Sequence, residues 1–308
     1  MKDWLCVARE EELQKAGDYM AFHVAREPAV LVRNKAGELR ALLNICAHRG
    51  AQVASGAGNL MRFSCPYHGW SYDLDGRMTG AAFMKDVQGF TKENCRLPPL
   101  RVAVWQGWVF VNFDDAAPPL EDFVSELDQE YGFLRQESCR LAAKFELEFD
   151  CNWKLLVERL IAQGLSGRRQ QADARRRGGI SAAHTSGTLT PDGQTLFRKM
   201  EALAGKPDNF AALAHLSPNL CMLARADHVH HLVSWPTAPA KTKLVAYILF
   251  PEAFHSEPGF AAKVEAYSGF LRRRLLESAP PAGESEAYVR LDKALGSSFQ
   301  HYLGRVFA

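Results

Sequence analysis

Two short motifs, each pairing one cysteine with one histidine, constrain this chain more than any other feature of its sequence. Cys46-x-His48 and Cys65-x-x-His68 are separated by sixteen residues. Thiolate sulfur and imidazole nitrogen are ligands that proteins use for zinc ions and for iron–sulfur clusters. The fold must therefore bring two loops together so that all four side chains can hold one metal centre.

Two kinds of metal centre use two cysteines and two histidines. One is a tetrahedral zinc ion, which would make the chain a zinc-stabilised interaction module. The other is a [2Fe–2S] cluster, in which two cysteines bind one iron and two histidines bind the other. Zinc sites of this ligand set usually group cysteine with cysteine, whereas each motif here supplies one residue of each type. The spacing therefore favours a [2Fe–2S] cluster with the ligands Cys46, His48, Cys65 and His68.

Composition and the first residues limit the possible partners and compartments. The 308 residues carry a formal net charge of +2, which supports neither a nucleic-acid partner nor a strongly acidic tail. Glutamates at 10–12 occupy the place where a secretory signal needs apolar residues, and the longest apolar run, 244–250, is too short to span a membrane. Seven cysteines, an odd number, fit a reducing compartment. We expect a cytoplasmic protein without a membrane partner.

The hydrophobic pattern predicts two domains of different class. Residues 19–43 alternate apolar and polar side chains around a turn at 34–37, and more strand-like segments follow, so an all-β domain is expected over 1–117. Two consecutive prolines then mark a boundary. Residues 118–308 mix helical and strand-like patterns, which predicts an α+β domain. Its helices are expected at 120–134, 153–165 and 260–276, with a last helix whose apolar residues recur over 288–306, and its strands at 140–149, 228–235 and 244–250.

The residues around the two motifs resemble a known family. The segments Cys46-Ala-His-Arg-Gly50 and Cys65-Pro-Tyr-His-Gly-Trp-Ser-Tyr72 are similar to the Rieske domain of ring-hydroxylating and related non-haem iron oxygenases. Respiratory Rieske proteins carry an additional cysteine in each loop, and Ala51 and Tyr67 occupy those places here, so the oxygenase branch is favoured. The resemblance implies a Rieske domain followed by a helix-grip-like domain with an antiparallel sheet. The glycine of each segment would let backbone amides approach the sulfurs, and the tryptophan would shield the cluster.

A second segment extends the resemblance into the α+β domain. Residues 152–158, Asn-Trp-Lys-Leu-Leu-Val-Glu, are similar to the segment that opens the helix carrying mononuclear iron ligands in these oxygenases. The register places Ala162 where the family has a bridging carboxylate, and Leu165 and Gln170 where it has two histidines. The family's third ligand is a late aspartate, but residues 228–291 contain none. These side chains are not ordinary Fe(II) ligands, so we expect the oxygen-activating iron to be absent from this chain.

Other histidines and two basic runs allow alternative interpretations. A second metal site could be rebuilt from residues outside the motifs, namely His184, His215, His228, His230 and His231. No carboxylate of evident purpose accompanies the last three, and the simpler interpretation is surface or half-buried strand histidines. The arginines within 168–177 and 272–274 are typical of a solvated loop and a helix face, although the first run could dock an acidic ferredoxin, reductase or partner subunit.

These observations lead to one principal hypothesis and one alternative. The principal hypothesis is an electron-transfer or auxiliary subunit of a heteromeric Rieske oxygenase. Its cluster would pass electrons from an NAD(P)H-dependent reductase or ferredoxin to the mononuclear iron of a partner catalytic subunit, in a trimer-based hetero-oligomer such as a hexamer. The alternative is a self-sufficient Rieske oxygenase, a hydroxylase or demethylase with non-standard iron ligands. Iron content separates them, at about two or about three atoms per chain.

Overall fold

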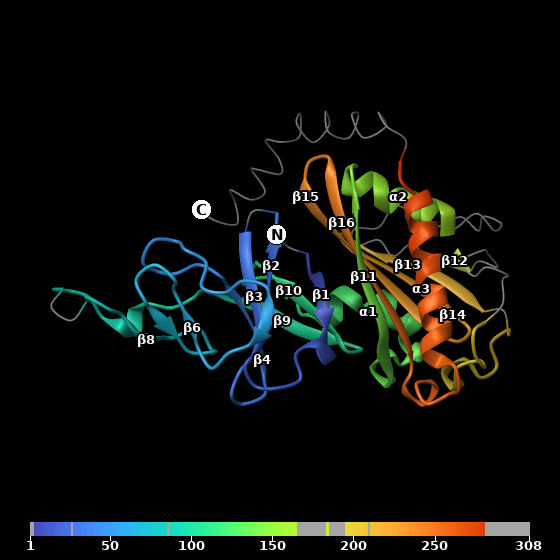
Figure 1. Cartoon of the computed structure of the whole chain (residues 1–308), viewed down its shortest axis with the longest axis horizontal. Coiled ribbons are helices and arrows are strands. Elements are labelled where there is room, and N and C mark those ends of the chain that lie inside the picture. The colour runs from blue at the N-terminus through green and yellow to red at the C-terminus, as the bar shows by residue number, and fades with distance from the viewer. Residues whose placement is uncertain are drawn as a thin grey trace. The chain divides into compact units, whose positions relative to one another are not determined.

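Antiparallel strand pairs organise the chain in this computed structural model (Figure 1). The described residues are 3–25, 27–84, 87–164, 183–184, 195–208 and 210–280. Contacts divide the chain into two compact units, the first formed by Met1–Val104 with Trp108–Ala117, and the second by Trp105–Gly107 with Pro118–Ala308. The short segment Trp105–Gly107, at the turn of a hairpin, is thus grouped with the second unit.

The first unit contains a seven-stranded sheet in the order β1-β10-β9-β4-β3-β2-β5 and a three-stranded sheet in the order β6-β7-β8. The larger sheet consists of β1 (Leu5–Arg9), β2 (Asp18–Val24), β3 (Glu27–Arg33), β4 (Leu39–Leu43), β5 (Ala57–Asn59), β9 (Pro99–Trp105) and β10 (Trp108–Asn112). The smaller sheet consists of β6 (Phe63–Ser64), β7 (Ser71–Tyr72) and β8 (Met78–Gly80). One hydrophobic cluster joins β3 and β4 to the smaller sheet and includes Cys46 and Cys65, so both motifs share one core.

The alternating pattern over 19–43 forms the hairpin strands of the larger sheet. Asn34 closes the predicted turn because its Oδ1 accepts hydrogen bonds from the backbone N–H groups of Ala36 (3.0 Å) and Glu38 (2.9 Å). Gly37 has a φ of 80°, a conformation that glycine adopts without strain. The turn chemistry thus sets the register in which β3 pairs with β4.

The second unit contains a six-stranded sheet in the order β11-β16-β15-β14-β13-β12. Its strands are β11 (Cys139–Phe149), β12 (Ala183–His184), β13 (Ala211–Leu216), β14 (Leu220–Arg225), β15 (Val229–Ala238) and β16 (Lys241–Pro251). Its helices are α1 (Leu120–Tyr131), α2 (Trp153–Gly164) and α3 (Phe260–Glu277). Short 3-10 helices occur in both units, at Glu10–Glu12, Lys92–Asn94, Gly132–Leu134, Gln136–Ser138, Glu201–Leu203 and Glu252–Phe254.

The predicted fold class, an all-β unit followed by an α+β unit with an antiparallel sheet, is confirmed. The predicted helices at 120–134, 153–165 and 260–276 correspond to α1, α2 and α3, and the last predicted helix, over 288–306, lies outside the described residues. The strands β13 and β14 were not predicted, because β14 is buried at every position and β13 at all but one, and neither shows polar alternation. No helix among the described residues is long and apolar enough to cross a membrane.

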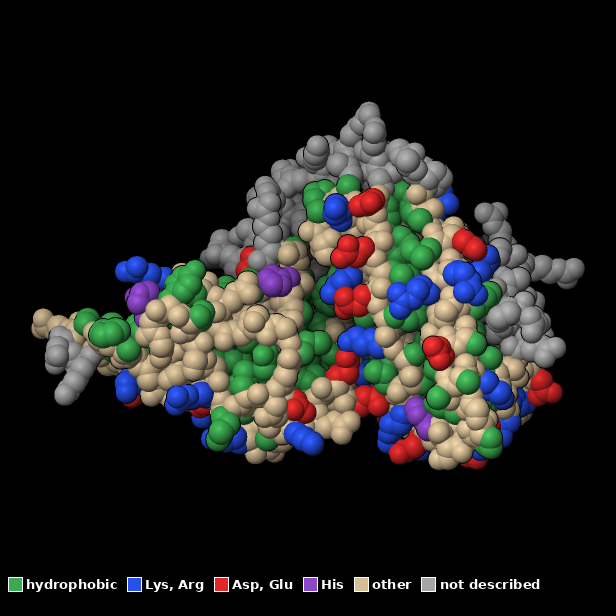
Figure 2. Space-filling view, viewed as in Figure 1, with side chains coloured by type: hydrophobic (Ala, Val, Ile, Leu, Met, Phe, Trp, Pro, Cys, Tyr) green, Lys and Arg blue, Asp and Glu red, His purple; other side chains and the backbone are tan. Residues whose placement is uncertain are grey.

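Helix α3 buries one side and exposes a charged one. The Arg272 guanidinium lies 4.5 Å from the centre of the Phe145 ring of β11, and Arg274 forms an ion pair with Glu277 at 2.7 Å. Figure 2 shows basic and acidic side chains interspersed over the region of this helix. The arginine run 272–274 is therefore an exposed helix face, as predicted. The other predicted run, 168–177, lies outside the described residues.

Candidate functional site

The two cysteine–histidine loops have the same backbone hydrogen-bond pattern. The N–H of Cys46 donates to the carbonyl of Ala51 (2.8 Å), and the carbonyl of Cys46 accepts from Gly50 (2.9 Å). In the second loop the N–H of Cys65 donates to the Trp70 carbonyl (2.7 Å), and its carbonyl accepts from the glycine four residues later (3.1 Å). Both glycines have positive φ, 74° and 70°. The chain therefore builds one turn twice, and each turn needs glycine at the same place.

The loops bring their two histidines together. The ring centres of His48 and His68 lie 4.6 Å apart, and the Trp70 ring stacks on His48 at 4.6 Å with an interplanar angle of 15°. Desolvation, followed by the nearby His68 and Arg49, lowers the pKa of His48, which favours the neutral imidazole that metals bind. Nδ1 of His68 is buried and has no hydrogen-bond partner among the described residues. Together with two buried cysteines, this nitrogen fits the ligand set of a [2Fe–2S] cluster.

Tyr72 contacts the sulfur of a predicted ligand. Its hydroxyl lies 3.2 Å from Sγ of Cys46 and accepts a hydrogen bond from the N–H of Ala47 at 3.0 Å. A metal-bound thiolate has no proton, so the Tyr72 O–H is the donor in the contact with sulfur. Burial, and then the hydrogen bond with Cys46, raise the pKa of Tyr72, so the phenol keeps its proton.

Asn44 closes the first loop from inside. Its side chain is fully buried, and its Oδ1 accepts from the N–H groups of Val53 (2.9 Å) and Ala54 (3.0 Å). Its Nδ2 donates to the carbonyl of Ala54 at 2.8 Å. One buried amide thus joins both ends of the segment that carries Cys46 and His48.

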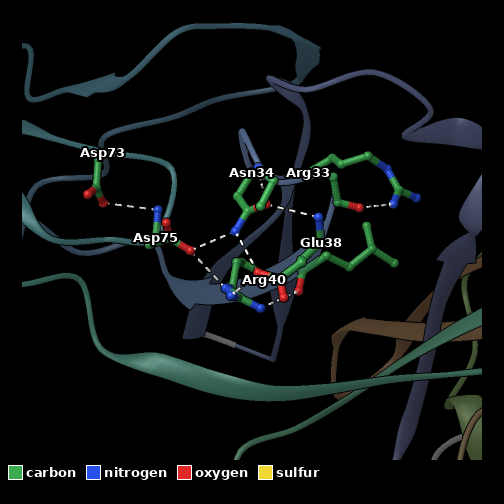
Figure 3. Close-up of polar contacts among 9 residues, drawn as sticks. Arg33, Asn34, Glu38, Arg40, Asp73 and Asp75 are labelled. Carbon is green, nitrogen blue, oxygen red and sulfur yellow. Dashed lines mark hydrogen bonds and ion pairs between the residues drawn. The ribbon is translucent and has the colours of Figure 1, made fainter.

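A polar network fixes the hairpin that follows the second loop (Figure 3). Asp75 accepts hydrogen bonds from Asn34 Nδ2 and Arg40 Nε, both at 2.9 Å, and its N–H donates to Asp73. Arg40 also pairs with Glu38. The bond from Asn34, and then the contact with Arg40, lower the pKa of Asp75. The β7–β8 turn is thereby attached to the β3–β4 turn.

Sequence reasoning predicted part of this arrangement. The two glycines and Trp70 lie where the motifs suggested, beside the predicted ligands. The roles of Tyr72 and Asn44 were missed, although Tyr72 lies within the motif segment and Asn44 directly precedes the first loop. An asparagine directly before a ligand loop is the signal that could have revealed the role of Asn44, because an amide that is buried there needs hydrogen-bond partners.

Helix α2 begins where the second family segment predicted. Asn152 precedes it, and its Oδ1 accepts from the N–H of Lys154 at 3.0 Å, as an N-cap does. Its Nδ2 donates to the carbonyl of Pro239 at 2.8 Å. The positions that the resemblance assigns to the family's two iron-binding histidines, Leu165 and Gln170, and the side chain of Ala162, at the bridging-carboxylate position, lie outside the described residues.

The strand histidines are more buried than predicted. His228, His230 and His231 are all fully buried, so the interpretation as surface or half-buried residues is wrong. A carboxylate does accompany them, since Asp227 Oδ1 lies 2.6 Å from Nδ1 of His228. His231 points to the opposite face of the sheet, where its Nε2 lies 2.7 Å from Oε1 of Gln136.

Within the described part of the chain, no three His, Cys, Asp or Glu side chains are arranged to hold a single metal ion. Each iron of a cluster with two cysteines and two histidines takes only two protein ligands, so this observation does not bear on the cluster site. The side chain of His184, one of the five histidines considered for a second metal site, lies outside the described residues.

Family models match both units of the chain. A model of the Rieske [2Fe-2S] domain matches residues 3–91, and a model of the ring hydroxylating alpha subunit (catalytic domain) matches residues 162–276. The chain joins a Rieske domain to a ring-hydroxylating alpha-subunit catalytic domain. The zinc-stabilised module is therefore excluded in favour of a [2Fe–2S] cluster.

Relatives of this chain are oxygenase subunits and dioxygenase alpha subunits. It is 38% identical over 162 residues to the carnitine monooxygenase oxygenase subunit of Acinetobacter baumannii, covering 51% of this chain and 43% of the relative. It is 31% identical over 167 residues to the biphenyl 2,3-dioxygenase alpha subunit of Rhodococcus jostii, covering 52% and 36%. The chain thus spans less than half the length of these relatives. The crystal structure of the apo quaternary ammonium Rieske monooxygenase CntA is similar with a TM-score of 0.69 and 26% identity, covering 90% of this chain and 76% of CntA.

The principal functional hypothesis from the sequence is wrong. An electron-transfer or auxiliary subunit was expected, but the relatives are oxygenase and alpha subunits, and a catalytic-domain model matches this chain. The expected absence of the mononuclear iron is not supported either, because the catalytic domain is present. The alternative, a Rieske oxygenase in its own right, agrees better with these comparisons.

Proposed function

We propose that this chain is the oxygenase component of a Rieske non-haem iron oxygenase that hydroxylates or oxidatively demethylates an organic substrate. The observation that carries the proposal is the combination, in one chain, of two matched cysteine–histidine loops with a catalytic domain of the alpha-subunit type. The relatives that match it are oxygenase subunits of a monooxygenase and of dioxygenases.

In this proposal residues 1–117 form the Rieske domain and its cluster accepts electrons one at a time. Imidazole ligands raise the potential of such a cluster above that of an all-cysteine cluster, which makes reduction by a biological reductase feasible. The Trp70 ring covers His48, and the Tyr72 hydroxyl donates to a ligand sulfur and stabilises the reduced cluster. The four ligands are Cys46, His48, Cys65 and His68.

Residues 118–308 form the catalytic domain in this proposal. A mononuclear Fe(II), when bound, would supply the site of dioxygen activation. The positions that carry its ligands in the family do not fit the metal here, because Ala162, Leu165 and Gln170 offer neither imidazole nor carboxylate. The iron in this proposal is therefore held by other side chains of the chain.

Partners follow from the same proposal. An NAD(P)H-dependent reductase or a ferredoxin supplies the electrons. Copies of the chain form a trimer-based oligomer, in which a head-to-tail ring can place the cluster of one subunit beside its neighbour's catalytic domain. A structure of the similar CntA has been related to inter-subunit electron transfer.

Metal content tests the proposal. The full chain, purified anaerobically and reconstituted with iron and sulfide, is expected to hold about three irons and two acid-labile sulfides, with a Rieske signal in the reduced EPR spectrum. A Cys46→Ser variant is the matched control, which should lose the EPR signal and both sulfides but keep about one iron. Two irons in the wild type and none in the variant would refute the oxygenase assignment.

A further inference from the structure

One face of the six-stranded sheet carries buried polar atoms without hydrogen-bond partners. Of nine such side-chain atoms among the described residues, five lie on this face, namely Nε2 of His215, Nε2 of His228, both ring nitrogens of His230, and Oγ of Ser234. Strand register places them together, because His215 is opposite Cys221, which is opposite Leu232, and residues two apart on β15 share a face. His228, His230 and Ser234 are fully buried.

Helix α3 and the start of α2 lie on this same face. The Tyr267 ring of α3 is centred 4.9 Å from His228 and 5.3 Å from His230. Thr242, which shares the face, donates through Oγ1 to the carbonyl of Cys151, just before α2, at 2.8 Å. The unpartnered atoms therefore lie on the helix-covered side of the catalytic domain.

Energetics indicate that these atoms have a partner beyond the described residues. More than about 90% of buried polar groups in proteins are hydrogen-bonded, and a buried group left without a partner destabilises the fold. A hydrocarbon bound against this face would leave all five atoms unpaired. A ligand with hydrogen-bonding groups would pair some of them and remove that penalty.

Charge decides which hydrogen-bonding group fits best. Three basic side chains, His228, Arg225 and His231, contribute to lowering the pKa of His230. Burial, and then these neighbours, lower the pKa of His230 well below its usual value, so its ring is neutral and keeps one N–H donor. The neighbouring Asp227 is already engaged by His228 and by two backbone N–H groups. The site around His230 therefore favours an anionic oxygen group.

We infer that this face is a wall of the substrate site and that it binds a substrate carrying a carboxylate, to which the His230 ring donates a hydrogen bond. The inference rests on the proposed function and deepens it, because it names the substrate class. Unsubstituted aromatic hydrocarbons, such as the biphenyl in the name of one relative's activity, are disfavoured as substrates.

Equilibrium binding to the cluster-loaded full chain tests the inference without turnover. Calorimetry would compare two probe pairs that differ in the carboxylate, gamma-butyrobetaine with butyltrimethylammonium, and benzoate with toluene. In at least one pair the carboxylate member is expected to bind about tenfold tighter or more. His230→Phe, which keeps a ring against Tyr267, should abolish that preference, and His230→Gln, which keeps an N–H donor, should retain part of it.

The control is His231→Phe, which removes an equally buried histidine from the opposite face and should leave the preference unchanged. The inference is overturned if the wild-type protein binds the two members of each probe pair equally, or if it binds none of the probes at about 10 mM. Internal water would then be the partner of these atoms. A preference that survives His230→Phe would overturn it as well. The iron count of the proposed function is measured independently, so the two proposals can fail separately.

Discussion

Tyr72 touches the predicted cluster site without being one of its ligands. Because its O–H donates to Sγ of Cys46, it stabilises the more negative, reduced cluster. A Tyr72→Phe variant should therefore lower the cluster potential by roughly 50 mV, which corresponds to about one net hydrogen bond for a one-electron couple. Redox titration followed by EPR measures the shift.

Tyr67 provides the matched control for that experiment. It neighbours His68 but is 72% exposed, so Tyr67→Phe should leave the potential nearly unchanged. A potential that is unchanged or raised in Tyr72→Phe would contradict the direction of the hydrogen bond assigned here.

The single side chain of Asp75 makes the stability of the fold depend on pH. Its folded-state pKa is lowered, by the Asn34 amide first and then by Arg40, so its contribution is complete above its unfolded pKa and is lost as the pH falls through the folded pKa. Asp75→Asn should lower the free energy of unfolding by about 1 kcal/mol at neutral pH. Urea titrations should show this difference shrinking below about pH 4. Asp115→Asn, at an exposed position, serves as control, and a difference that persists into acid would refute the assignment.

Two turns between strands differ in the space that they leave for a side chain in place of glycine. Gly37 and Gly76 both have a φ of 80°, but only a Cβ at Gly76 would meet other atoms, at 2.9 Å from the Leu97 carbonyl oxygen and 3.1 Å from Leu42. Gly37→Ala should cost about 1 kcal/mol of unfolding free energy through backbone strain alone. Gly76→Ala should cost about 1–3 kcal/mol more through the clash. Equal losses in chemical denaturation would show that the β7–β8 turn moves freely.

Sequence patterns were sufficient to predict some strands and helices but not others. Alternation and turn residues predicted the β2–β4 strands, and helical periodicity predicted α1 and α3. The strands β13 and β14 were missed because they are buried on both faces, which removes the alternating signal. The motif spacing predicted the two cluster loops, but the partners of Tyr72 and Asn44 depend on contacts that spacing does not encode.

The division into two compact units predicts the behaviour of the whole molecule. Both predicted cysteine ligands belong to a core of the first unit, so cluster binding contributes to the folding free energy of that unit. Scanning calorimetry should show two transitions, and Cys46→Ser should lower one of them by more than about 5 °C while the other stays in place. A single transition that shifts as a whole would mean that the units unfold together.

At this scale the sequence predicted the architecture better than the activity. The order of an all-β unit and an α+β unit follows from local patterns, whereas the function depends on how buried side chains meet. The absence of two histidines at Leu165 and Gln170 and of the bridging carboxylate at Ala162 suggested a non-catalytic subunit, but the comparisons with oxygenase and alpha subunits corrected that conclusion. The buried histidines of β15 illustrate the reason, since their burial was not visible in the sequence.

The repeated turn also explains why the two histidines of the cluster site are not interchangeable. Both loops place glycine four residues after cysteine, yet the histidine comes two residues after Cys46 and three after Cys65. Identical spacing would put the second histidine at position 67, where the present side chain is 72% exposed. Placing the histidine one position later in the same turn therefore gives an inward-facing ring instead of an outward-facing one, and a designer who copied the first loop twice would obtain a symmetric scaffold with one ligand in solvent.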